Sequence, residues 1–301
     1  MLTFDETARL TPSVTRSITR VNASLALRFE YDAARRTAVL HAGLQEPPLK
    51  VVRAFGLEDG STLIHLHNVS GGLLGGDQLA MSLEIGENAH VQVTTTGATR
   101  IYRSRVDARP ATQRIDVRVG QNACLECLPD PIIPFAGSRF AQHTTIHLDS
   151  GAGLFWWEVL APGREARDEL FAYHAVEMKT SISALDNPIA VERVRVEPKV
   201  YPTSSPARLE KYRYWATFHI CRVGVDPSEW LALEHQLRDV ARESSPTAET
   251  LWGISTLPAH GIVCRCLAVC GRDVLADLNK LWRAAKLSLF GTEAIPPRKV
   301  N

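Results

Sequence analysis

Apolar and polar residues alternate along much of the first two thirds of the chain. In the clearest stretch, Leu79, Met81, Leu83 and Ile85 alternate with smaller or polar residues, and a period of two predicts a half-buried β-strand. The same pattern, bounded by Gly, Pro, Asn and Asp, predicts further strands. Their expected ranges are 24–30, 37–41, 49–55, 62–66, 90–96, 112–119, 123–128, 138–148, 153–161, 170–182 and 189–196. Many short strands at regular spacing predict an all-β core.

The last third of the chain has a helical pattern. Asp226, Pro227 and Glu229 supply an N-cap, a proline at the first helical position and an acidic first turn. The residues expected on the apolar face of this helix are Trp230, Leu233, Leu237 and Val240. A strand is expected over 261–270 and a second amphipathic helix after it. The apolar face of that helix comprises Val274, Leu278, Leu281, Ala285 and Leu289.

Together these elements predict a mainly β protein, with two amphipathic helices laid against the strands in the C-terminal third. A chain of 301 residues is long enough for one extended domain. We expect a single domain over 1–301, in which 1–197 form the β core, 198–206 a proline-rich loop, and 207–301 strands and the two helices.

Two glycine pairs, Gly71-Gly72 and Gly75-Gly76, flank two leucines and precede Asp77. Pairs this close predict a sharp turn or a close approach of two backbones. A phosphate-binding loop would need a following helix, together with a lysine and a serine or threonine. Here a strand is expected to follow and Asp77 would repel phosphate, so the pattern favours a tight turn over a nucleotide site.

Several motifs occur in the order typical of one family. They are His67 through Asp77; Thr95, Thr96, Gly97 and Ala98 with Tyr102, Arg103 and Ser104; Leu125 through Pro129; Gly163-Arg164 with Glu169 and Phe171; and Glu192-Arg193. Over 43–193 the chain closely resembles the UreD (UreH) family of urease accessory proteins, because a chance match of this extent is implausible.

The resemblance implies a layered, β-helix-like stack of strands with a small helical part. It further implies a non-enzymatic scaffold for inserting nickel into urease. Such a scaffold binds apo-urease and the accessory protein UreF, and through UreF it recruits the GTPase UreG. No tightly bound cofactor is expected, and Ni²⁺ is in transit.

The resemblance also implies a water-filled, partly acidic passage for nickel. The positions that match the family's passage residues are Asp59, Asp77, Thr99, Glu158 and Glu192. Oxygen ligands suit transit because tight Cys or multi-His coordination would hold Ni²⁺ in place. Buried carboxylates are costly unless paired, hydrated or metal-bound, and Glu126, Glu158 and Glu192 each sit in an otherwise apolar run. The alternative is that these glutamates lie on the solvent face of their strands.

His65 and His67 would lie on one face of a strand, where contact with travelling nickel and a structural role are both open. A metal-dependent hydrolase using His65, His67 and Asp77 is the competing function, and it would need a third convergent ligand. A structural β protein without partner or metal is the remaining alternative. The sequence lacks the Gly-x-Ser-x-Gly pattern of a nucleophile elbow.

Six cysteines in a chain of this length favour reduced thiols over a disulfide framework. Cys124 and Cys127 are three apart, so in a strand their thiols would point to opposite faces. Cys264, Cys266 and Cys270 would share a face, but the first and last would lie about 20 Å apart in a straight strand. Core thiols are therefore favoured over a zinc or redox site.

Charge and hydropathy exclude two classes of partner. With 34 basic and 33 acidic residues the net charge is +1, without a long block of one sign, so no nucleic-acid surface is expected. The opening residues include Asp5 and Glu6 and lack the apolar core of a signal peptide, and no stretch approaches the ~20 apolar residues of a membrane span. We therefore expect a cytoplasmic protein that does not bind a membrane.

Overall fold

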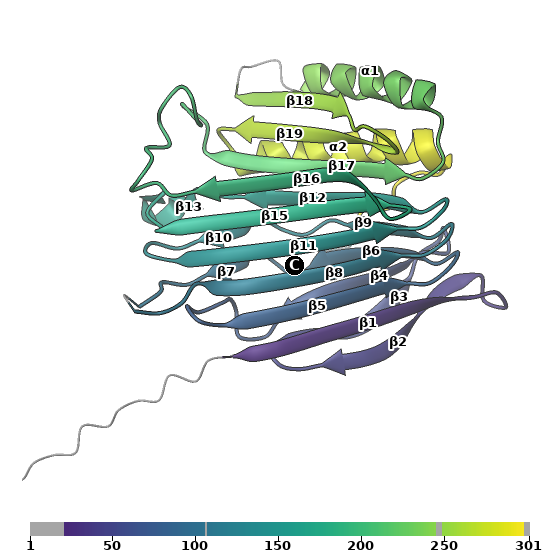
Figure 1. Cartoon of the computed structure of the whole chain (residues 1–301), viewed down its shortest axis with the longest axis horizontal. Helices are drawn as coiled ribbons and strands as arrows, with labels where there is room; N and C mark the ends of the chain where they lie inside the picture. The colour runs from purple at the N-terminus through teal and green to yellow at the C-terminus, as the bar shows by residue number, and fades with distance from the viewer. Residues whose placement is uncertain (1–20, 106, 245–248, 298–301) are drawn as a thin grey trace, which may run out of the picture.

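The computed structural model describes residues 21–105, 107–244 and 249–297. Within these residues, the strands form a seven-stranded sheet and a ten-stranded sheet that face each other, with a small two-stranded sheet at one end (Figure 1). The seven-stranded sheet has the order β16 (Asn187–Val196), β15 (Ala175–Ala184), β11 (Arg139–Leu148), β8 (Ala111–Val119), β5 (Gln78–Ile85), β1 (Asn22–Asp32) and β2 (Thr37–Gln45).

The ten-stranded sheet has its main strands in the order β18 (Thr250–Thr256), β19 (Gly261–Ala268), β17 (Tyr214–Arg222), β12 (Gly153–Leu160), β9 (Cys124–Cys127), β6 (His90–Thr95), β4 (Thr62–Asn68) and β3 (Leu49–Gly56). Two short strands, β7 (Thr99–Ile101) and β10 (Ile132–Pro134), pair with each other beside it. The small third sheet joins β13 (Gly163–Arg164) and β14 (Glu169–Leu170), with a 3₁₀ turn, η1 (Glu165–Arg167), between them.

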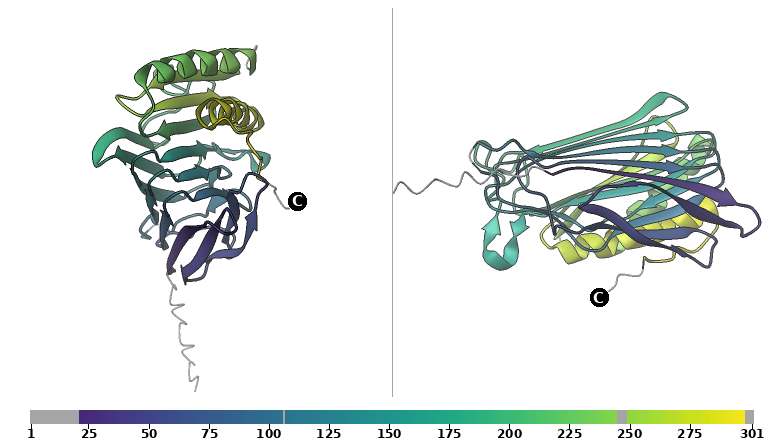
Figure 2. Two further views of the ribbon diagram at one scale, coloured as in Figure 1. Left: turned by 90° about the vertical axis from the view of Figure 1, so that its right-hand side faces the viewer. Right: turned by 90° about the horizontal axis from the view of Figure 1, so that it is seen from below.

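The central part of the chain winds as a flattened coil between the two large sheets. From β4 to β15 the long strands alternate between the ten-stranded and the seven-stranded sheet, and each pairs in parallel with the strand one coil earlier. Successive coils are therefore stacked on one another, and the two sheets face each other, as the turned views of Figure 2 show, with an apolar core between them. This confirms the expected layered, β-helix-like stack of mainly β structure.

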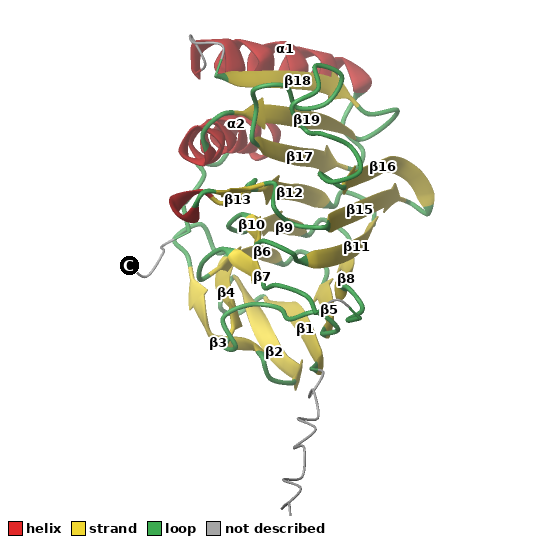
Figure 3. Ribbon diagram, turned by 90° about the vertical axis from the view of Figure 1, so that its left-hand side faces the viewer, coloured by secondary structure: helices red, strands yellow, loops and turns green. Residues whose placement is uncertain are grey.

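The C-terminal part adds a third layer. β17, β19 and β18 extend the ten-stranded sheet in antiparallel fashion beyond β12. The helices α1 (Pro227–Ser244) and α2 (Gly271–Phe290) cover the outer face of this extension, with a second core between helices and sheet (Figure 3). Asp226 caps α1 by accepting a hydrogen bond from the Ser228 amide at 2.8 Å. Both expected helices are confirmed, and no helix in the described residues is long and apolar enough to span a membrane.

The expected strands are all found, with shifts at some ends. The largest shift is at 170–182, where the chain makes the β14 pairing and a turn before β15 begins at Ala175. The proline-rich loop is longer than expected and continues to β17, a nine-residue strand that the sequence analysis did not place. β18 was also not placed, because Gly253 interrupts the strand and the apolar residues Leu251, Trp252 and Ile254 do not strictly alternate with polar ones.

The glycine pairs form the tight turn that their spacing predicts. Gly71 and Gly76 have φ values of +79° and +95°, and a β-strand, not a helix, follows. A Cβ on Gly72 would lie 2.5 Å from the Arg100 carbonyl oxygen, so the turn packs directly against the backbone of β7. The Leu73 amide donates to that same oxygen at 2.8 Å. The glycine turn of the motif His67 through Asp77 thus packs against the segment that carries Thr95 through Ser104, a second family motif.

Substitution of Gly72 by alanine tests this contact. The added Cβ would collide with backbone, so we expect Gly72→Ala to lower the free energy of unfolding by about 1–3 kcal/mol, as overpacking does. Denaturant-induced unfolding followed by fluorescence measures the change. Gly97→Ala is the matched control, because a Cβ at Gly97 meets nothing within 4 Å. Equal stability of the two variants would contradict the proposed contact.

A buried ion cluster fastens α2 to the first coils. The Lys286 Nζ lies 2.7 Å from Glu126 Oε1 on β9 and 3.1 Å from Asp59 Oδ2 in the turn between β3 and β4. Burial would lower the pKa of Lys286, but the adjacent Glu126 and Asp59 carboxylates raise it above its ordinary value. Gln92 donates both to Glu126 and to the Ile295 carbonyl, which ties the C-terminal segment to the same place. The cluster joins residues 227 positions apart.

Removal of the lysine alone would leave Glu126 buried without its cation. We expect Lys286→Met to cost about 3–5 kcal/mol of stability, as is typical when one partner of a buried pair is lost. The double variant Glu126→Leu/Lys286→Met removes both charges, and we expect it to recover most of that loss. Thermal and denaturant unfolding of the three proteins provide the comparison. A single variant as stable as the unmodified chain would show that the pair does not hold the helix.

Candidate functional site in the interior between the sheets

Glu158 is a carboxylate in the interior of the stack. Every residue of its strand, β12, is buried, because one face meets the seven-stranded sheet and the other meets the helices. Glu158 shares its face with Trp156 and Leu160, and points towards the seven-stranded sheet. There Gln142 donates to its Oε1 at 2.5 Å and Thr180 to its Oε2 at 2.9 Å. The carboxylate therefore links β12 to both β11 and β15 across the interior.

Polar residues on neighbouring strands continue from Glu158 in both directions. We call this set the polar belt: Gln113, Gln142, Glu158, Thr180, Glu192, Thr217 and Arg265. Strand register places Gln113 opposite Gln142, Thr180 opposite Glu192, and Thr217 opposite both Glu158 and Arg265. The Arg265 Nη2 lies 2.6 Å from Glu192 Oε2, so an ion pair joins the edge strand of one sheet to the other sheet.

Three buried polar atoms beside the belt have no hydrogen-bond partner among the described protein atoms. They are Thr144 Oγ1, Thr217 Oγ1 and His219 Nδ1. Buried polar atoms without a protein partner are usually satisfied by ordered water, and their loss of hydrogen bonds would otherwise be costly. Since all three residues lie on strands beside Glu158, this region has the donors and acceptors needed to hold water.

The environment strongly perturbs two ionisable groups of this region. Burial raises the pKa of Glu158 to about 7, and the nearby charge of Glu192 adds to the effect, while the hydrogen bonds from Thr180 and Gln142 oppose it. Burial and then the positive charge of Arg265 lower the pKa of His219 to about 4. At neutral pH His219 is therefore an uncharged imidazole, and both the protonated and the ionised form of Glu158 are populated.

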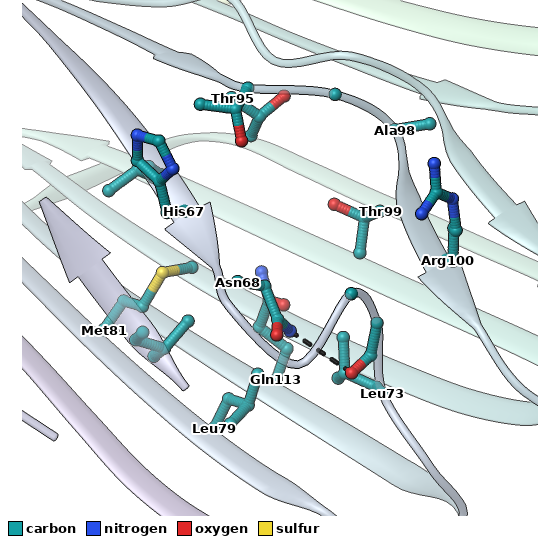
Figure 4. Close-up of a pocket in the computed structure, with 16 residues that line it drawn as sticks. His67, Asn68, Leu73, Leu79, Met81, Thr95, Ala98, Thr99, Arg100 and Gln113 are labelled. Carbon is teal, nitrogen blue, oxygen red and sulfur yellow. Dashed lines mark hydrogen bonds between the residues drawn. The ribbon is translucent and has the colours of Figure 1, made fainter. Parts of the chain in front are cut away.

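A cavity of about 200 Å³ lies beneath the glycine turn. Figure 4 shows His67, Thr95 and Thr99 on one side of it, and Gln113, Leu79 and Met81 on the other. Its polar lining and size are sufficient for several waters. Gln113 belongs both to this cavity and to the polar belt, so the two regions adjoin at β8. Burial, with the nearby His65 and Lys50, lowers the pKa of His67 and favours its neutral form.

The structure brings only some of the expected passage residues together. Glu158 and Glu192 belong to the polar belt, and Thr99 and His67 line the adjoining cavity. Asp59 lies on the opposite face of the ten-stranded sheet, in the ion cluster with Lys286. Of the glutamates noted in apolar runs, Glu126 also lies there, so neither Glu126 nor Glu158 is on a solvent face.

Asp77 and His65 have neighbours that give them structural roles. Asp77 is buried, and its two oxygens accept hydrogen bonds from the Leu74 amide at 2.8 Å and the Val21 amide at 3.1 Å. It therefore closes the glycine turn and holds the start of β1. His65 is buried and packs edge-on against Phe55, with ring centroids 5.8 Å apart.

No group of three His, Cys, Asp or Glu side chains in the described residues converges as a metal site would require. The set His65, His67 and Asp77 is thus not assembled for hydrolysis. The described cysteines are all free, and Cys124 and Cys127 lie in the two different cores, as the strand geometry predicts.

Sequence reasoning missed Gln142, Thr180, Thr217 and His219. In each case an amide, hydroxyl or imidazole occupies a position in the alternating pattern that is apolar elsewhere in the same strand. In β11, for example, Gln142 and Thr144 have the same parity as the buried Phe140 and Ile146. That parity is the signal that could have identified them as interior residues.

Comparison with known proteins agrees with the motifs and the fold. The family model described as UreD urease accessory protein matches residues 21–301. A Herpetosiphon aurantiacus protein named urease accessory protein UreD is 44% identical over 93% of this chain and 97% of its own length. Proteins of the same name from Pseudomonas aeruginosa and a Bacillus species are 33% and 27% identical, over 89% and 88% of this chain.

The class that these matches define is that of the urease accessory proteins. Within that class, the chain belongs to the UreD family, since the family match extends from the start of β1 to the last residue. The resemblance first noted over 43–193 therefore covers the C-terminal strands and helices as well.

The raised pKa of Glu158 predicts a pH-dependent stability. The folded chain binds a proton that the unfolded chain releases between the ordinary value of 4.5 and about 7, so Glu158 makes folding less favourable as pH rises across this window. Glu158→Gln removes this pH-dependent contribution to the free energy of unfolding. We expect the unfolding free energy of the variant, minus that of the unmodified chain, to grow by at most about 3 kcal/mol from pH 4.5 to 7. Denaturant titrations in the presence of a chelator measure it, and a difference independent of pH would contradict the assignment.

Proposed function

We propose that this chain is a non-enzymatic scaffold for urease maturation, which conducts Ni²⁺ through its interior to apo-urease. Membership of the UreD family supports the role in maturation. The observation that most supports conduction is the polar belt around Glu158, with three buried polar atoms beside it that have no partner among the described protein atoms. An interior filled only for stability would be apolar, because a buried carboxylate costs free energy unless water, a partner or a cation compensates it.

The ligand chemistry of the belt suits transit. Carboxylate, amide and hydroxyl oxygens bind Ni²⁺ more weakly and exchange it faster than thiolates or several imidazoles would. Cys127 and Cys221, which belong to the core between the sheets, do not offer such a trap, since burial raises the pKa of both thiols and favours their protonated forms. A hydrated ion would meet Glu158 as its main charged ligand and would leave it again, because no group of three His, Cys, Asp or Glu side chains in the described part of the chain completes a site there.

The route we propose follows the adjoining polar regions. Nickel would enter or leave at the cavity beneath the glycine turn, beside His67 and Thr99. Gln113 and Gln142 would pass it to Glu158, and the other opening would lie where the Glu192 to Arg265 ion pair closes the edge between the sheets. In this proposal Asp77 and Asp59 shape and fasten the stack without lining the route.

The partners in our proposal are apo-urease and UreF, with the GTPase UreG recruited through UreF. Family membership supports this assembly, in which nickel released by GTP hydrolysis reaches the interior. The chain itself needs no resident cofactor for this function, and Ni²⁺ is its cargo.

Replacement of Glu158 tests conduction separately from assembly. In a reconstituted activation with apo-urease, UreF and UreG, we expect Glu158→Gln to lower nickel incorporation and urease activity about tenfold, because the conductive carboxylate is lost. Glu84→Gln is the matched control, since Glu84 lies on the outer face of β5 and its side chain is 56% exposed. Co-purification should be unchanged in both variants. Full activation with Glu158→Gln would exclude this carboxylate from the route.

A further inference from the structure

His219 is an imidazole in the interior that neither the family motifs nor the expected passage residues include. It lies on β17, is 1% exposed, and its Nδ1 has no hydrogen-bond partner among the described protein atoms. Register places it opposite Trp156, while Thr217, two residues earlier, lies opposite Glu158. His219 and Glu158 are therefore diagonal neighbours on one face of the sheet.

Side chains in this relation can act on one ligand. Diagonal neighbours in an antiparallel pair have Cα atoms about 7–8 Å apart, which long side chains bridge readily. Glu158 already reaches into the space between the sheets, where Gln142 and Thr180 hold it. The orphaned Thr217 Oγ1 lies on the same strand and face, so the imidazole, the carboxylate and a hydroxyl surround one region that has unmet hydrogen-bonding capacity.

The charges around His219 allow a cation to approach it. Arg265 on β19 is the nearest cationic side chain that acts on His219, but its guanidinium is paired with Glu192 on β16. Glu158 on β12 supplies the remaining negative charge when it is ionised. Cys221, two residues further along β17, is a protonated thiol because burial raises its pKa to about 12. The imidazole is thus the softest ligand atom in this region that is free of a proton at neutral pH.

We propose that His219 is a nickel ligand of the interior, which together with Glu158 and water forms a transient two-residue site that selects Ni²⁺ over Mg²⁺. This inference rests on the proposed conduction of nickel and adds the origin of its selectivity. A path of oxygen ligands alone would also suit Mg²⁺, which is abundant and prefers oxygen. One imidazole nitrogen shifts the preference towards Ni²⁺, and a site with only two protein ligands still releases the ion.

Direct contact is tested by NMR of the full chain labelled with ¹⁵N-histidine. Ni²⁺ is paramagnetic, so we expect substoichiometric Ni²⁺ to broaden the His219 ring signal while Mg²⁺ leaves it unchanged. The signal is assigned by its absence in His219→Gln. In Glu158→Gln we expect the Ni²⁺ concentration for half-broadening to rise about tenfold, as loss of a supporting group typically does. Broadening of exposed histidines alone would overturn the proposal, and this measurement needs no variant to retain activity.

Selectivity is tested in reconstituted urease activation with limiting Ni²⁺ and excess Mg²⁺. Mg²⁺ is raised from the level that GTP hydrolysis by UreG requires to a large excess. We expect this excess to lower activation with His219→Gln about tenfold relative to the same variant at low Mg²⁺, whereas the unmodified chain is little affected. His143→Gln is the matched control, because His143 is exposed on the outer face of β11. Equal resistance of all three proteins to Mg²⁺ would overturn the role of His219.

The two proposals fail in different ways. If Glu158→Gln slows delivery but His219 neither broadens with Ni²⁺ nor affects selectivity, conduction stands and His219 is structural. If Glu158→Gln delivers nickel at the normal rate, the proposed conduction through this region is wrong, and so is the proposed selectivity site of His219 and Glu158.

Discussion

The in-register parallel pairing of successive coils is the constraint on which the rest of this structure depends. Since β1, β5, β8, β11 and β15 pair residue for residue, side chains of one parity form rows across these five strands of the seven-stranded sheet. The strands β4, β6, β9 and β12 of the other sheet do the same. Polar residues at one level of neighbouring strands, such as Gln113 and Gln142, therefore lie side by side, and a belt forms without an inserted loop or domain.

This arrangement separates two kinds of buried charge. On the helix side of the ten-stranded sheet, Lys286 neutralises Glu126 and Asp59 at close range, and the charges fasten α2. On the interior side, Glu158 has only uncharged donors, and its pKa is raised to about 7. A carboxylate without a fixed cation can accept a mobile one. The first cluster thus stabilises the fold, while the second leaves capacity for a ligand.

Much of the fold could be predicted from the sequence because burial on one face imposes the two-residue period of β5 and the three-to-four-residue spacing of α2. The stacking of coils could not, since alternation says that Gln142 is on one face of its strand but not which strand lies opposite. That information came from the family resemblance. β17 was not placed, although Ala216, Phe218 and Ile220 alternate with Thr217 and His219, and both of its faces are buried.

The candidate site was predictable only in part for the same reason. Glu158 stood out as a charge in an apolar run, whereas Thr180 and His219 did not, because hydroxyls and imidazoles are common on exposed strand faces. Asp77 was selected by its motif, yet its carboxylate accepts two backbone amides at the turn. The motif selected Asp77 as an important residue, and its contacts with two backbone amides give it a structural role.

The most direct test of conduction is to locate nickel within the assembled complex. A crystal of the chain with its accessory partners, supplied with Ni²⁺ and measured at the nickel absorption edge, would show anomalous density wherever the ion resides. The account predicts density between the two sheets, beside the Glu158 carboxylate. Density confined to the outer surfaces of the sheets, with an interior that stays empty of nickel under conditions that activate urease, would contradict it.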